Sequence, residues 1–156
     1  MSKNLEKPSK ILPIFAHYNS LTIKMVTRFE PIAGKTAEII EALMASEDMP
    51  ISDSLQFKLR LCIEEVVENI VSYAYDGGNG WVEVGTQLDG DTLTVTLKDE
   101  GVPFNPLEKS DPDITLSAED RQIGGLGIFL CKQMMDKLEY NRTEGCNVFK
   151  MIKQLK

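Results

Sequence analysis

The stretch WVEVGTQLDGDTLTVTLKD, residues 81–99, decides the fold class of this chain. It contains two runs rich in β-branched residues, 81–88 and 92–99, on either side of Asp-Gly-Asp. Such runs favour strands, and Asp-Gly between them is the strongest short hairpin signal in the chain. We therefore expect an antiparallel hairpin in the middle of the chain.

Two helices are predicted before the hairpin. Apolar residues recur with helical spacing within residues 34–47, which favours an amphipathic helix there. Further on, Ser52 and Asp53 are good N-caps for a longer helix. That helix should end near Tyr75, where the breaker DGGNG begins.

The pattern predicts the remaining elements on either side of these. Before the first helix we expect a flexible leader at residues 1–19 and a strand at residues 21–29. After the hairpin we expect a long polar loop at residues 105–123, a helix at 126–136, and a second hairpin at 137–155 with its turn at Glu-Gly-Cys. This order is typical of an α+β fold. We expect a two-layer sandwich over residues 20–156, in which a mixed, mostly antiparallel sheet carries helices on one face.

Composition narrows the classes of function. The 156 residues suffice for one domain with a real core. A formal net charge of −7 argues against nucleic acid as a direct partner. No apolar run reaches the roughly 20 residues that cross a bilayer, and no secretory signal is evident, so we expect the cytoplasm and no membrane partner. The three cysteines lack CxxC spacing and are expected to be reduced.

Glu65 and Asn69 lie one turn apart at the border of the apolar stripe of the longer helix. A carboxylate there could act as a base. The amide oxygen one turn on could bind a hard cation such as Mg²⁺. Taken alone, however, the pair fits an ordinary helix border better than a site.

Asp99 ends the second strand of the hairpin and is followed by Gly101 and Pro103. A carboxylate fixed at a strand end can accept a hydrogen bond from an exocyclic amine, and the glycine lets a flat ring approach the backbone. Alone, the same residues are more typical of a turn.

Three glycines, Gly124, Gly125 and Gly127, stand between the long loop and the next helix. Free N–H groups at a helix start bind anions, and glycines let phosphate oxygens reach them. This would give an acidic protein a local anion site. A flexible hinge explains the glycines equally well.

The order of these motifs is more informative than any one of them. Glu-x-x-x-Asn, then Asp-x-Gly-x-x-Phe, then Gly-Gly-Leu-Gly-Ile resembles the N box and the two glycine boxes of the GHKL ATPases. Within that superfamily the chain is most similar to the anti-sigma-factor serine/threonine kinases, over about residues 20–155. The resemblance implies the Bergerat fold, with ATP and Mg²⁺ bound.

The resemblance also implies roles for residues. Glu65 would be the general base, Asn69 the Mg²⁺ ligand and Asp99 the acceptor of the adenine amino group. A lid at about residues 105–123 would close over ATP. Further nucleotide contacts would come from the glycine boxes and the lid: Gly101, Phe104, Arg121, Gly124, Gly125, Leu126 and Gly127. For Arg121, a partner contact or a surface salt bridge is an equally good account.

The implied function is an ATP- and Mg²⁺-dependent kinase and anti-sigma factor. Its partners would be an anti-sigma-factor antagonist of the STAS type, which it phosphorylates, and a sigma factor. A homodimer is one candidate assembly, and the sequence does not decide the oligomeric state. The alternative is a nucleotide-gated regulatory binding module without kinase activity. A histidine-kinase catalytic domain fits less well, because the only histidine is His17 in the leader. Ile70 and Tyr73 stand where many kinases of the group carry Ala and His.

Overall fold

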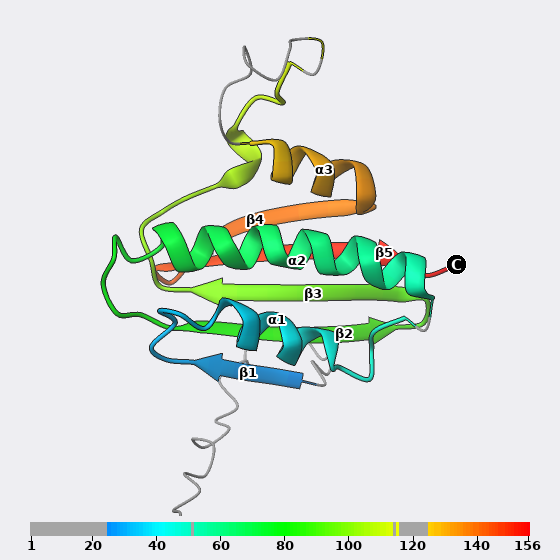
Figure 1. Cartoon of the computed structure of the whole chain (residues 1–156), viewed down its shortest axis with the longest axis horizontal. Coiled ribbons are helices and arrows are strands. Elements are labelled where there is room, and N and C mark those ends of the chain that lie inside the picture. The colour runs from blue at the N-terminus through cyan, green and yellow to red at the C-terminus, as the bar shows by residue number, and fades with distance from the viewer. Residues whose placement is uncertain (1–24, 51, 114, 116–124) are drawn as a thin grey trace, which may run out of the picture.

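The computed structural model describes residues 25–50, 52–113, 115 and 125–156 (Figure 1). The predicted leader and residues 21–24 of the first predicted strand lie outside this range. In chain order the elements are β1 (Met25–Phe29), α1 (Thr36–Met44), α2 (Asp53–Tyr73), β2 (Val82–Asp89), β3 (Thr92–Asp99), the 3-10 turn η1 (Pro106–Glu108), α3 (Leu126–Met134), β4 (Lys137–Thr143) and β5 (Cys146–Gln154).

The described strands form one five-stranded sheet in the order β1-β2-β3-β5-β4. Each neighbouring pair among them is antiparallel. The helices lie on one face of this sheet, with α1 and α2 in front of its middle and α3 beside β4 (Figure 1). The predicted α+β sandwich, with a mostly antiparallel sheet and helices on one face, is therefore confirmed. The described sheet contains no parallel pair, so it is not mixed.

Both predicted hairpins are present. In the first, Asp89 pairs with Thr92 across a two-residue turn, and Gly90 adopts a φ of 58°, which glycine tolerates at no steric cost. In the second, Thr143 pairs with Cys146. Cys146 therefore belongs to β5 and not to the connection, because a two-residue turn suffices there.

The buried face of α2 forms the centre of the core. Its fully buried residues are Leu59, Cys62, Ile63, Val66 and Val67. Each large apolar side chain buried in this way stabilises the fold by about 1.5–3 kcal/mol. The α2 stripe packs on the helix-facing side of β3, where Leu93, Val95 and Leu97 are buried. Because side chains alternate along a strand, Asp99 lies on this same side at the end of β3.

Some element boundaries differ from those predicted. The third helix ends at Met134 and not at residue 136, because Met135 is extended, with φ −93° and ψ 153°, and leads directly into β4. Ser52 is the N-cap of α2, as predicted, but its side chain makes no capping hydrogen bond.

The three cysteines are free and buried, as predicted. Among the described helices, none combines the length and the apolar character needed to cross a membrane.

Candidate functional site

A pocket of about 110 Å³ opens between the end of α2, the turn after β3, the start of α3 and the ends of β4 and β5. This is smaller than the roughly 300–1,000 Å³ of pockets that hold whole small ligands, so it accommodates a flat ring or one part of a larger molecule. Its lining is mostly apolar and includes Val66, Ile70, Val102, Phe104, Ile128 and Phe149. The polar side chains among the lining residues are those of Asn69, Tyr73, Asp99, Tyr140 and Asn147.

Asp99 supplies the only carboxylate among the described residues that line the pocket. It is 4% exposed, and its Oδ1 accepts hydrogen bonds from the Gly101 N–H at 2.9 Å and from Asn147 Nδ2 at 2.8 Å. These bonds leave Oδ2 as an acceptor for a ligand. Burial raises the pKa of Asp99, and the hydrogen bonds from Asn147 and Gly101 oppose that rise. The arrangement suits a flat ring that carries an exocyclic amine.

Gly101 is required for packing as well. A Cβ placed on it would lie 2.3 Å from the carbonyl oxygen of Ala74 at the end of α2. The N–H of Val102 donates to that same oxygen at 2.8 Å. The glycine therefore lets the turn after β3 dock directly on α2, a role that the sequence pattern did not reveal.

Glu65 and Asn69 lie on the side of α2 that faces α3. Asn69 Nδ2 donates to Glu65 Oε1 at 3.4 Å, which leaves the amide oxygen of Asn69 as an acceptor for a cation. A Cβ placed on Gly127 would lie 1.8 Å from the carboxyl carbon of Glu65. The carboxylate thus lies directly against the first turn of α3, and only glycine at position 127 leaves room for it.

The start of α3 brings the last motif to the same place. Gly125 is the N-cap and adopts a left-handed φ of 89°, which favours glycine. Leu126 begins the helix and is exposed. The first N–H groups of a helix have no partner within it and can bind an anion. Arg121 and Gly124, also predicted as nucleotide contacts, lie outside the described residues.

Phe104 lines the pocket at its rim and is 37% exposed. Lys109 Nζ lies 5.4 Å from its ring centroid. Next to it, Pro106 is buried in η1, where Asn105 caps the turn by accepting from the Leu107 N–H at 3.0 Å. The first residues of the predicted lid are therefore a fixed turn, whereas residues 114 and 116–123 of that segment lie outside the described range.

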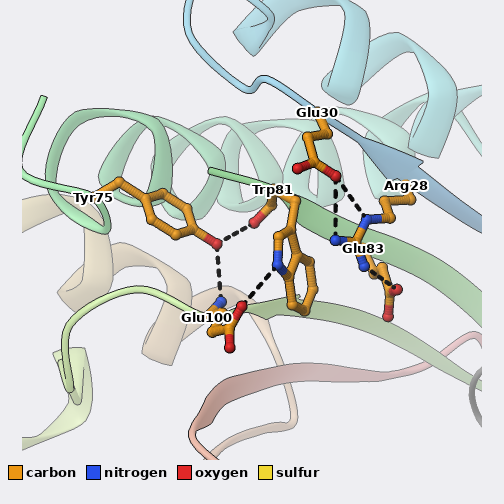
Figure 2. Close-up of polar contacts among 6 residues, drawn as sticks. All are labelled: Arg28, Glu30, Tyr75, Trp81, Glu83 and Glu100. Atoms are coloured by element: carbon orange, nitrogen blue, oxygen red, sulfur yellow. Dashed lines mark hydrogen bonds and ion pairs between the residues drawn. The ribbon is translucent and has the colours of Figure 1, made fainter. Parts of the chain in front are cut away.

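A hydrogen-bonded brace holds the Asp99 turn in place (Figure 2). The Tyr75 hydroxyl donates to the carbonyl oxygen of Trp81 and accepts from the Glu100 N–H at 2.9 Å. Trp81 Nε1 in turn donates to Glu100 Oε2 at 3.1 Å. On the far side of the indole, the Arg28 guanidinium lies 4.1 Å from the ring centroid. The end of α2, the start of β2 and the turn after β3 are thus joined at one hydroxyl group.

We expect Tyr75→Phe to destabilise the fold by about 1–2 kcal/mol, because the hydrogen bonds of the hydroxyl group to the Glu100 N–H and the Trp81 carbonyl are lost, and each such bond contributes about 0.5–1.5 kcal/mol. For a chain of this size that is a fall in melting temperature of about 3–6 °C, measurable by circular dichroism. The matched control is Tyr73→Phe, the same change on a side chain that is 64% exposed. Equal melting temperatures for the two variants would show that the brace does not stabilise the turn.

Asn147 and Tyr140 are site residues that the sequence analysis missed. Both line the pocket, and Asn147 lies directly opposite Asp99 in the β3–β5 register. Asn147 is 6% exposed, which is unusual for an amide side chain. In the sequence, Asn147 is only a polar residue at the start of a predicted strand, and that position does not identify Asp99 as its partner.

The donor set near Asn69 fits one kind of metal. Among the described residues no group of three or more His, Cys, Asp and Glu side chains could hold an ion. Mg²⁺ usually keeps several waters and binds through one or two protein oxygens together with substrate phosphates. A single amide oxygen at Asn69 therefore fits Mg²⁺ that arrives with a nucleotide.

The antiparallel sheet with helices on one face defines the class of the protein, an α+β domain. Its pocket lies beside α2 and α3 and contains the carboxylate of Asp99. A family model described as "Histidine kinase-like ATPase domain" matches residues 31–153. The chain belongs to this family, which confirms the assignment predicted from the three motifs.

The chain is also similar to curated bacterial regulators. It is 31% identical over 97 residues to the serine/threonine-protein kinase BtrW of Bordetella bronchiseptica, covering 62% of this chain and 68% of that protein. It is 23% identical over 137 residues to the anti-sigma F factor of Clostridium beijerinckii, covering 87% and 94%. It is 32% identical over 95 residues to the serine-protein kinase RsbW of Listeria monocytogenes, covering 58% and 60%.

Proposed function

We propose that the protein is an ATP- and Mg²⁺-dependent serine/threonine protein kinase that also acts as an anti-sigma factor in a partner-switching circuit. The observation that carries the proposal is the contact of the Glu65 carboxylate with Gly127, which joins the first and third motifs beside the Asp99 pocket. Relatives named as protein kinases and as anti-sigma factors support it.

Two regions of the site bind different parts of the nucleotide. Asp99 accepts the adenine amino group through Oδ2, and Phe104 covers the base at the rim. The N–H groups at the start of α3, from Gly125 onward, bind phosphate oxygens. Asn69 would hold Mg²⁺ through its amide oxygen, and the ion would supply positive charge that neutralises the phosphate groups.

Glu65 performs the proton transfer. The hydrogen bond from Asn69 Nδ2 fixes Oε1 of Glu65, so Oε2 is left to accept the proton of a serine or threonine hydroxyl as that hydroxyl attacks the γ-phosphate. The hydroxyl oxygen forms the new bond to phosphorus, the bond to the β,γ-bridging oxygen breaks, and ADP leaves. Contact with Gly127 holds the carboxylate at the helix start where phosphates bind.

Partner switching follows from the charge that the reaction transfers. A phosphoserine or phosphothreonine carries a charge of about −1.5 to −2 at neutral pH. This chain has a formal net charge of −7, so a phosphorylated STAS-like antagonist is repelled from it. Release of the antagonist leaves the protein free to hold a sigma factor.

The test is incubation of the purified protein with Mg²⁺, ATP labelled in the γ-phosphate, and candidate STAS-type antagonists from the same organism. The proposal expects label on a serine or threonine of the antagonist. ATP binding without any transfer would instead establish the nucleotide-gated binding module.

We expect Gly127→Ala to lower the transfer rate by at least about tenfold, and up to about 10²-fold, because displacing a reacting group by about 1 Å can cost that much. The added methyl group would occupy the position of the Glu65 carboxylate. The rate is measured in the same transfer assay, with Gln133→Ala on the exposed side of α3 as control. A Gly127→Ala rate equal to that of the control would show that Glu65 does not act from this position.

A further inference from the structure

Asn147 uses its whole hydrogen-bonding capacity within the site. Its Nδ2 donates to Asp99 Oδ1 at 2.8 Å and to the Val102 carbonyl at 3.0 Å. Its Oδ1 accepts from the Tyr140 hydroxyl at 2.7 Å and from Arg142 Nη1 at 2.8 Å. An amide group has two N–H donors and two acceptor lone pairs, so every one of them is occupied.

The two acceptor bonds fix the orientation of the amide. Arg142 can only donate, so it requires the oxygen of Asn147, and not the nitrogen, on its side. Arg142 Nη1 also donates to the Gly101 carbonyl at 3.0 Å, which ties it to the turn. With the oxygen held there, the Asn147 nitrogen must face Asp99. If the amide were flipped, its oxygen would face the buried carboxylate of Asp99. Neither Asp99 Oδ1 nor the Val102 carbonyl would then receive a hydrogen bond from Asn147.

We propose that Asn147 is a positioning residue for nucleobase specificity, which holds the Asp99 carboxylate with Oδ1 occupied and Oδ2 presented to an exocyclic amine. The proposal rests on the proposed function, in that the amine is the adenine amino group of ATP. Asn147 acts through Asp99, its partner in the β3–β5 register. Tyr140 and Arg142 act one step further out, by selecting the orientation of the Asn147 amide.

The variant Asn147→Asp tests this role with little change in shape. At low pH one proton remains between the two facing carboxyl groups, so a donor to Asp99 Oδ1 is kept. At higher pH both groups ionise and repel each other, because like charges in one site disfavour the doubly charged form. The affinity for ATP should therefore fall relative to the wild type as the pH rises.

The experiment is calorimetric titration of the full chain with ATP and Mg²⁺ at about pH 6 and about pH 8. The titration of the nucleotide itself cancels in the ratio of the variant and wild-type dissociation constants. We expect this ratio to grow by at least about tenfold between the two pH values, which corresponds to one unit of pKa. Asn141→Asp is the matched control, because Asn141 is exposed on β4 and its change adds the same charge. Its ratio should stay near one.

A ratio for Asn147→Asp that is the same at both pH values would overturn the proposal, because a purely structural role predicts a loss of affinity without pH dependence. If Asn147→Asp does not fold, the double variant Tyr140→Phe with Arg142→Met removes the two donors that orient the amide. It should weaken ATP binding by about 5–30-fold, the loss of one or two hydrogen bonds, and unchanged affinity would overturn the proposal.

The wild-type titration separates the two levels of the account. A wild-type chain that binds no ATP refutes the proposed function and, with it, this inference. A wild-type chain that binds ATP, together with a pH-independent Asn147→Asp ratio, refutes the inference alone.

Discussion

Glu65→Gln is expected to lower the rate of phosphate transfer to the antagonist by about 10²–10⁴-fold, the usual contribution of a positioned general base. An amide cannot take the proton of the attacking hydroxyl. It has the shape of the carboxylate, however, and its oxygen can still accept from Asn69 Nδ2, as Glu65 Oε1 does at 3.4 Å. Affinity for ATP should therefore remain close to that of the wild type.

The control for this variant lies on the same helix. Glu68 is exposed and accepts a hydrogen bond from Ser72 Oγ at 3.2 Å, so Glu68→Gln makes the same chemical change away from Gly127. Transfer rates are measured with both variants at saturating ATP. Equal rates for Glu65→Gln and Glu68→Gln would place the base elsewhere.

Asp99→Asn is expected to weaken ATP binding by about 5–150-fold, which corresponds to the roughly 1–3 kcal/mol of a buried polar group left unmatched. The amide oxygen can still accept from Gly101 and Asn147, so its nitrogen takes the place of Oδ2. A donor then faces the adenine amino group, which is itself a donor. The loss should appear in calorimetric titration with ATP and Mg²⁺.

The same variant should keep or raise the stability of the fold at neutral pH. Burial raises the pKa of Asp99 in the folded state above its ordinary value. The unfolded chain therefore loses this proton at a lower pH than the folded chain, and stability falls as the pH rises through the folded pKa. Asparagine carries no charge at any pH, so the variant does not lose stability by burying an ionised carboxylate. A melting temperature below that of the wild type at neutral pH, with Asp89→Asn as an exposed control, would contradict this reasoning.

Most of the fold could be predicted because its signals are local. The two strand-favouring runs within residues 81–99, on either side of Asp-Gly-Asp, predicted the central hairpin, and the apolar stripe of α2 predicted the helix that covers it. The border position of Glu65 and Asn69 followed from helical spacing alone. The family then followed from the order of three motifs, each of which was ambiguous by itself.

The missing part of the site depends on contacts between distant segments. Asn147 meets Asp99 because β5 pairs with β3 and not with β2. No local pattern sets that pairing. Similarly, Gly127 and Glu65 are adjacent only because α3 packs on α2. The sequence suggested phosphate binding for this glycine, whereas the structure adds the space that it leaves for a carboxylate.

The most direct test of the central claim, that the three motifs form one ATP site, is amide NMR of the isotope-labelled full chain during titration with ATP and Mg²⁺. We predict a single saturable event of one ATP per chain. In it, the backbone signals of Gly101 and Gly127 and the side-chain amide signals of Asn69 and Asn147 should shift with one common dissociation constant. Saturable shifts confined to residues outside this group, or no saturable shift at all, would contradict the account.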